Sequence, residues 1–233
     1  MSETRASSAD LMGTLARAAV GVIAYVLFGV AAGRVLGLHP SADDVESLLV
    51  AHGCGCVGFC LAAAVLPASV RLVPARGSLA APLFYVVFLL LWVPFVVFAY
   101  TWLLHRLSVP FEPQEQLAYF GGADRGRWQF AAALATVVFV GPLAEEYAFR
   151  GYCQDALAAL AGGRFALVGT AAVFGVFHGL VFAVPLAMLG LLFGWLRVRY
   201  RSLAPGFVVH VLHNGLTVAV MLAAPDILNE AYR

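Results

Sequence analysis

Long stretches without a charged side chain constrain this 233-residue sequence more than any other feature. The three clearest stretches enclose 24 residues between Glu46 and Arg71, 29 between Arg76 and Arg106, and 24 between Arg201 and Asp226. Because about 20 apolar residues are enough for a helix to cross the hydrocarbon core of a bilayer, each stretch predicts a transmembrane helix. Charged side chains make up only 12% of the sequence, against about 25% in an average soluble domain, so an ordinary soluble fold is excluded.

Three further uncharged stretches complete the predicted fold. They enclose 16 residues between Arg17 and Arg34, 17 between Arg127 and Glu145, and 32 between Arg164 and Arg197. The last is too long for one comfortable crossing, and Pro185 marks a place where it can break into two short helices. We therefore predict an all-α polytopic membrane protein with about seven transmembrane helices, six to eight being compatible with the pattern. It forms one membrane-embedded domain over residues 1–233, with a short polar tail at residues 1–10 and a buried polar active site.

Charge and cysteine content narrow the classes of partner. With 14 basic and 13 acidic side chains the net charge is +1, so no broad basic face is available for nucleic-acid phosphates. The cysteines have no spacing typical of a disulfide framework or a thiolate zinc site, and we expect all four to be small core residues: Cys54, Cys56, Cys60 and Cys153. The expected surroundings are the lipid bilayer of a bacterial inner (cytoplasmic) membrane. The sequence leaves the oligomeric state open.

Two adjacent acids at the end of an apolar stretch form the first unusual polar cluster. A charged side chain at the centre of a bilayer costs about 2.5–3.5 kcal/mol on insertion scales, so an ionisable residue there is a functional candidate. Glu146 and Arg150 are four residues apart and share a helical face, which predicts an ion pair. Glu145 points about 100° away from Glu146, and a simple pair at the membrane interface leaves it without a partner.

Two further helices supply histidines. His178 lies in an apolar segment between Gly175 and Gly179, small residues that permit close helix contact. His210 and Asn214 are four residues apart, with His213 on the neighbouring edge of the same helix. A lone histidine in a membrane helix is typical of packing, whereas three polar groups on one turn favour a function.

A turn at Gly162-Gly163 relates the first cluster to the second. Glu145 lies 17 residues before Gly162, and His178 lies 15 residues after Gly163. At 1.5 Å per residue, both side chains lie roughly 22–26 Å from the turn. Antiparallel packing therefore brings Glu145 and His178 to similar depth, provided that the helix continues through residues 147–161.

Water is the nucleophile that this set of groups suits. The sequence has no serine placed beside a histidine and no His-Glu-x-x-His helix for zinc. The carboxylate of Glu145 can take a proton from a water molecule that His178 also holds. His210 and Asn214 can donate hydrogen bonds to the oxygen that becomes negative as an amide carbonyl is attacked.

The polar clusters resemble the motifs of a known family. In order along the chain they read Glu145-Glu146-x-x-x-Arg150, Phe174-x-x-x-His178 and His210-x-x-x-Asn214. These motifs are similar to those of the CAAX-protease and bacteriocin-processing (Abi) family of glutamate-type intramembrane endopeptidases. The resemblance covers the helices of residues 128–223, which we expect to be the catalytic helices.

The resemblance implies a role for each motif residue. Glu145 is the base that activates water, His178 is its partner, and His210 and Asn214 are the oxyanion donors. Mainly structural roles are implied for the remaining motif residues, Glu146, Arg150 and Phe174. His213 is not part of the motif, so it either tunes the site or packs.

Several alternatives remain open at this point. The substrate is a membrane-associated protein or peptide, which can be a CAAX-type tail, a leader peptide or a C-terminal sorting tag. We expect no metal or other cofactor, because Asn214 is a poor zinc ligand and Glu146 has Arg150 as a partner; the alternative is a zinc protease with its metal on Glu145, His178 and His210. From another functional class, the alternatives are a non-catalytic membrane scaffold and a proton-coupled transporter, although the sequence lacks the related halves typical of transporters.

Overall fold

The computed structural model describes residues 8–37, 45–109, 120 and 127–224, and all regular secondary structure in these ranges is helical. Six helical runs within them are long and apolar enough to cross a membrane: Asp10–Leu36, Ser47–Val65, Ser78–Arg106, Trp128–Ala161, Leu180–Tyr200 and Ala204–Ala223. A seventh apolar helix, Gly163–Phe177, is shorter. The predicted all-α polytopic membrane fold is therefore confirmed. Residues 1–7 of the expected polar tail lie outside the described residues, and the rest of it belongs to the first helix.

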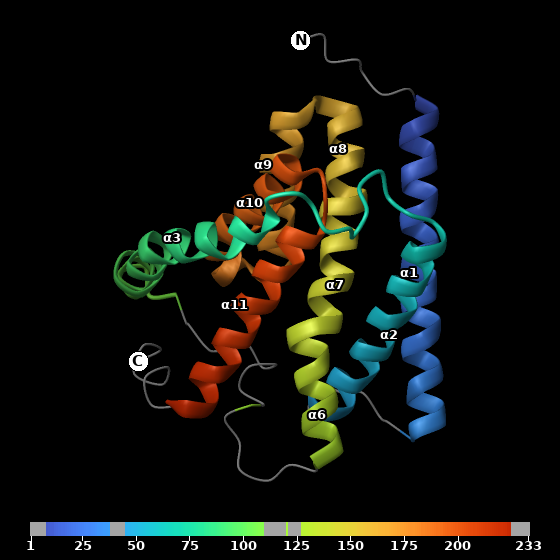
Figure 1. Ribbon diagram of the computed structural model, residues 1–233. Helices are drawn as coiled ribbons and strands as arrows, with labels where there is room; N and C mark the ends of the chain where they lie inside the picture. Colours follow the sequence, from blue (N-terminus) through green and yellow to red (C-terminus); the bar gives the residue numbers. More distant parts are fainter. Residues whose placement is uncertain (1–7, 38–44, 110–119, 121–126, 225–233) are drawn as a thin grey trace.

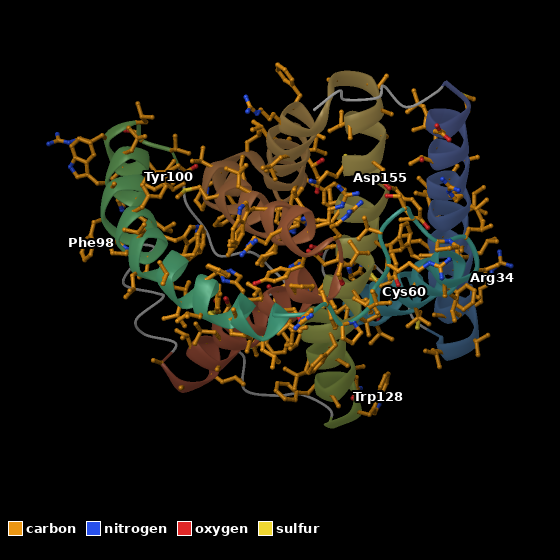
Figure 2. All side chains as sticks on the ribbon, turned by 45° about the horizontal axis from the view of Figure 1, so that its top comes forward. Arg34, Cys60, Phe98, Tyr100, Trp128 and Asp155 are labelled. Atoms are coloured by element: carbon orange, nitrogen blue, oxygen red, sulfur yellow. The ribbon has the colours of Figure 1, made fainter. Side chains whose placement is uncertain are left out.

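The first two spans lie together on one side of the molecule, and the third span lies on the opposite side (Figure 1). Helices α1 (Ser8–Leu36) and α2 (Val45–Val65) pack against each other, and α3 runs nearly across the direction of α1 (Figure 1). The third span consists of the 3₁₀ turn η1 (Ser78–Ala80), α3 (Ala81–Pro94), the π-helical segment η2 (Phe95–Tyr100) and α4 (Thr101–Arg106). The regular α-helix ends at Pro94, which has no N–H for the next intrahelical hydrogen bond. Apolar side chains such as Phe98, which is 72% exposed, project outward (Figure 2), as expected for a surface facing lipid.

The fourth span is one continuous helical run that carries the two adjacent acids. In order it contains α6 (Arg127–Ala135), the π-helical η3 (Thr136–Val140), α7 (Gly141–Glu145), the π-helical η4 (Glu146–Cys153) and α8 (Gln154–Ala161). Pro142 follows η3 and lacks the N–H that would bond to the carbonyl of Val138, which accounts for irregular hydrogen bonding there. Glu145 lies at the junction of α7 and η4, and π-helical turns are frequent at functional sites.

The predicted turn between the first two clusters is confirmed. Helix α8 ends at Gly162, whose φ of 86° suits glycine, and α9 (Gly163–Phe177) folds back beside it (Figure 1). The helix continues without interruption from Tyr147 to Ala161, as the depth argument required.

The prediction of a break at Pro185 is wrong in position. The helix ends earlier, at His178 and Gly179, where Gly179 has a φ of 98°, and the 3₁₀ turn η5 (Leu180–Phe182) follows. Pro185 instead lies in the first turn of α10 (Ala183–Tyr200), where its missing N–H would have no intrahelical partner. The conformational freedom of Gly179 therefore determines the break.

The last two helices enclose the largest buried cluster around the three motifs. Helix α10 is followed by α11 (Ala204–Ala223), and both pack against α3. Aromatic and aliphatic side chains from α3, η4, α9, α10 and α11 form one buried cluster: Ala81, Tyr85, Phe149, Phe174, Leu189, Phe193, Leu196 and Val209. Gly190 lets α9 and α10 approach closely, because a Cβ there would lie 3.0 Å from the Cα of Ala171. The polar residues of the three motifs border this cluster.

Candidate active site

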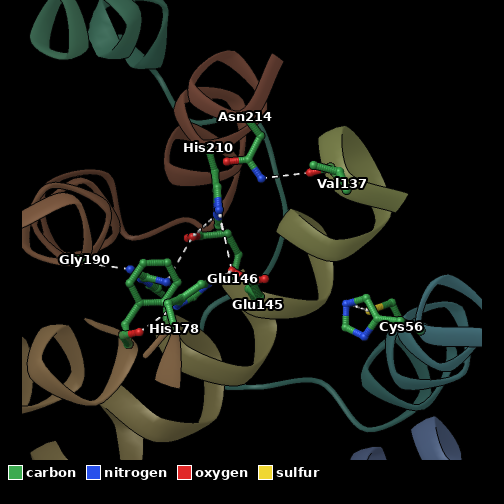
Figure 3. A network of polar contacts seen from close by, with 11 residues as sticks. Cys56, Val137, Glu145, Glu146, His178, Gly190, His210 and Asn214 are labelled. Atoms are coloured by element: carbon green, nitrogen blue, oxygen red, sulfur yellow. Dashed lines mark hydrogen bonds and ion pairs between the residues drawn. The ribbon is translucent and has the colours of Figure 1, made fainter. Parts of the chain in front are cut away.

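Three helices bring Glu145 and two histidines together. Oε2 of Glu145 lies 3.7 Å from Nε2 of His178 on α9 and 3.6 Å from Nε2 of His210 on α11 (Figure 3). The side chains of Glu145 and His178 are 24% and 22% exposed, whereas that of His210 is 4% exposed. The predicted equal depth of Glu145 and His178 is therefore confirmed. His210 reaches the same carboxylate oxygen, which places the third motif beside the first two.

The second nitrogen of each imidazole is fixed by a partner. Nδ1–H of His178 donates a 2.7 Å hydrogen bond to the carbonyl oxygen of Phe174. Nδ1 of His210 lies 3.2 Å from Oε1 of Glu146, and since an ionised carboxylate only accepts, this nitrogen carries the hydrogen. In each neutral ring Nε2 is then an acceptor, and both Nε2 atoms face Glu145.

The separations around Glu145 leave its Oε2 without a direct hydrogen bond. Distances of 3.6 and 3.7 Å between heavy atoms are too long for direct hydrogen bonds. Among the described residues, Oε2 of Glu145 has no hydrogen-bond partner. A carboxylate oxygen and two imidazole acceptors pointing at one place suit a small polar molecule such as water.

Glu146 joins the first motif to the third. The predicted ion pair is confirmed, since Oε1 of Glu146 lies 3.4 Å from Nη1 of Arg150, and both side chains are fully buried. Arg150 also donates from Nη2 to the carbonyl oxygen of Gly190, at 3.4 Å. The same Glu146 oxygen holds Nδ1 of His210. Spacing within one helix predicted the partner four residues on but not this contact from α11.

Asn214 is tied to the fourth span. Its Nδ2 donates a 2.8 Å hydrogen bond to the carbonyl oxygen of Val137, within the π-helical segment η3 (Figure 3). An amide nitrogen carries two hydrogens, so one remains for another acceptor. The predicted role of Asn214 as an oxyanion donor therefore remains compatible with its position.

His213 packs away from the carboxylates. Its Nδ1 shares a 3.0 Å hydrogen bond with the hydroxyl of Tyr85, and its ring meets Trp92 edge to face with centroids 5.3 Å apart. Both aromatic partners lie on α3. Of the two roles that the sequence left open, the contacts support packing.

The first half of the chain also contains a polar cluster, which the sequence analysis did not single out. His52 on α2 shares a 2.8 Å hydrogen bond with the hydroxyl of Tyr25, and its Nε2 lies 3.5 Å from Sγ of Cys56. The spacing of four residues between His52 and Cys56 was the available signal, since it places both on one helical face. All four cysteines are free, but only Cys56 is buried as expected for a small core residue, whereas Cys54, Cys60 and Cys153 are half-buried.

Glu145, His178 and His210 carry the donor types that zinc prefers, carboxylate oxygen and imidazole nitrogen. Within the described ranges, no group of three or more His, Cys, Asp or Glu side chains is arranged to hold a metal ion. The expected absence of a metal stays a prediction, which chelation tests.

One known family matches the second half of the chain. Residues 127–216 match the family described as type II CAAX prenyl endopeptidase, Rce1-like. The matched segment begins at α6 and includes all three motifs, from Glu145 to Asn214. No curated protein and no solved structure matches the chain.

Proposed function

We propose that this protein is an intramembrane endopeptidase in which Glu145 activates water; the match of residues 127–216 to the Rce1-like, type II CAAX prenyl endopeptidases supports this proposal. The observation that carries this proposal is the convergence of two imidazole Nε2 atoms on one oxygen of Glu145. Each of the three side chains comes from a different helical segment of the bundle. A scaffold gives no reason for that arrangement, and a proton-coupled transporter would in addition show two related halves, which the sequence lacks.

The first step is attack by water on the substrate. A water molecule between Glu145 and His178 gives one proton to Oε2 of Glu145 while its oxygen bonds to the carbonyl carbon of the scissile amide. Nε2 of His178 accepts a hydrogen bond from the second O–H of the water and so fixes its orientation, because Nδ1–H is held by the carbonyl oxygen of Phe174. This second hydrogen stays on the attacking oxygen. The carbonyl π bond breaks and its electron pair moves to the oxygen, which becomes an oxyanion.

The second step is collapse of the tetrahedral intermediate. The carbon–nitrogen bond breaks, and Glu145 returns its proton to the leaving amine. His210 and the free N–H of Asn214 are the donors for the oxyanion in this proposal. Because Glu146 holds the hydrogen on Nδ1 of His210, donation from Nε2 requires the doubly protonated, cationic ring.

The proposed substrate is a membrane-associated protein or peptide. The family match favours a CAAX-type C-terminal tail over a leader peptide or a sorting tag. Large, exposed apolar side chains lie on either side of His178 in the sequence: Phe177 is 74% exposed and Leu180 is 79% exposed. These positions suit a substrate that approaches through lipid.

The deciding experiment changes the proposed base without changing its size. Glu145→Gln is expected to lower the cleavage rate by roughly 10²–10⁴-fold, the usual contribution of a general base, while the protein remains folded in detergent. The assay follows a prenylated CAAX-type peptide with purified protein in lipid nanodiscs.

Asp155→Asn is the matched control. Asp155 lies on the same helical run and forms an ion pair with Arg197 outside the Glu145 group, so the same acid-to-amide change should leave turnover near wild type. If Glu145→Gln retains wild-type turnover, the proposed base is wrong. If the wild-type protein leaves the prenylated peptide intact but a leader or sorting-tag peptide is cut, the CAAX-type substrate is wrong and the catalytic proposal stands.

A further inference from the structure

Phe193 on α10 contacts the active site although it belongs to none of the three motifs. Its side chain is 1% exposed, and its ring stacks on the imidazole of His210 with centroids 4.6 Å apart and planes 22° apart. We propose that Phe193 is a positioning residue that fixes the plane of His210 and stabilises its cationic form during turnover. This inference rests on the proposed function, in which His210 donates from Nε2.

Two aromatic rings confine the imidazole of His210. Phe193 covers it in a stacked arrangement, and Phe174 meets it edge to face at 5.9 Å and 79°. Glu146 holds Nδ1. With two rings and one hydrogen bond fixing its orientation, the imidazole can direct Nε2 only toward the region of Glu145.

The ring of Phe193 lies against both partners of Glu146, Arg150 and His210. Cζ of Arg150 lies 5.0 Å from the ring centroid of Phe193 and 4.3 Å from that of Phe174. The face of an aromatic ring carries negative electrostatic potential, so it attracts a guanidinium or an imidazolium within about 6 Å. Phe193 therefore sets the spacing of Arg150 and His210 around one buried carboxylate. An aliphatic side chain of similar size would fill the space without this attraction.

Several ionisable groups surround His210, and their charges affect the pH at which its imidazole loses a proton. The fourth span contributes two carboxylates and a guanidinium, α9 contributes one imidazole and α11 contributes another: Glu145, Glu146, Arg150, His178 and His213. A change confined to the Phe193 ring removes none of these groups, but it weakens the attraction of the ring for Arg150 as well as for His210. A graded change in that ring therefore measures its interaction with both cations, and the titration of His210 itself reports the part that acts on the imidazole.

Ring fluorination provides that graded change. Phenylalanine carrying one, three or five ring fluorines at position 193 keeps its shape while the negative face weakens. We expect kcat on the prenylated peptide to fall stepwise, by about tenfold for the pentafluoro ring, with KM unchanged. The alkaline limb of the kcat–pH profile should move to lower pH, because a less stabilised cation loses its proton earlier.

The control is the same series at Phe59, a buried ring that packs edge to face on Tyr152. It should change neither kcat nor the pH profile. Ring-nitrogen NMR of His210 in the Glu145→Gln background measures the same protonation shift without turnover, so it separates this inference from the proposed function. An unchanged kcat, an unchanged NMR titration, or equal effects at Phe193 and Phe59 would overturn the positioning role.

Discussion

The two halves of the molecule use their polar side chains differently. In the helices of Trp128–Ala223 the buried polar groups face one another across long sequence separations, as Glu146 does with His210. In the spans of Asp10–Arg106 the polar groups hold helices together, as Tyr25 does with His52. The second half therefore holds the residues of the proposed chemistry, and the first half supports their geometry.

Helix α3 and its π-helical extension η2 give the clearest case of such support. Nε1 of Trp92 donates to the carbonyl oxygen of Pro185 at 2.9 Å, and the hydroxyl of Tyr100 donates to that of Val181 at 2.6 Å. Both acceptors lie just beyond His178, in η5 and the first turn of α10. The third span thus fixes the connection that follows His178, the proposed partner of Glu145.

Histidine substitutions should give the largest differences in turnover. His178→Ala and His210→Ala are each expected to lower kcat by about 100-fold or more, since each removes a group that handles a proton or the oxyanion. His213→Ala and His52→Ala should retain substantial activity, because these rings contact Tyr85 and Tyr25 rather than Glu145. Turnover of the four purified variants on one peptide measures the ranking. A larger loss for His213→Ala than for His210→Ala would show that the active face of α11 was assigned wrongly.

Alanine substitutions at two glycines, one in each half of the molecule, should have effects of intermediate size. A Cβ at Gly206 would lie 2.7 Å from Oε2 of Glu146, and one at Gly58 would lie 2.6 Å from Cγ of Phe28. Overpacking of this kind typically costs about 1–3 kcal/mol, so both alanine variants should unfold at lower temperature. Only Gly206→Ala should also lower kcat of the folded protein, because it displaces the carboxylate that holds His210. Thermal unfolding measures the loss of stability, and turnover per folded molecule measures the loss of activity. An equal fall of kcat in Gly58→Ala would remove the distinction between the two halves.

Regular helix geometry explains which parts of the site were predictable from sequence. The rise per residue and the turn at Gly162 were enough to place Glu145 beside His178, and four-residue spacing was enough to pair Glu146 with Arg150. The contact between Glu146 and His210 was not predictable, because it depends on how α11 and the fourth span are rotated about their axes. Two π-helical segments change that rotation in the fourth span, and an extrapolated period of 3.6 residues does not include them.

Single aromatic residues were less predictable still. Phe193 is one of 17 phenylalanines, and nothing in its spacing separates it from those that face lipid. Its role depends on a stacked contact between α10 and α11, which only tertiary packing creates.

Chelation should have the smallest effect of all, with activity unchanged. A catalytic zinc needs about three protein ligands and an open position for water. Oε1 of Glu146 is engaged with Arg150 and His210, and the nitrogen of Asn214 donates to Val137. Turnover should persist after prolonged exposure to a strong chelator, with the zinc-saturated chelator as control, and elemental analysis should find no stoichiometric zinc. Loss of activity that added zinc restores would make Glu145 a ligand, leave Glu146 as the remaining candidate for the base, and reverse the roles proposed for the two acids.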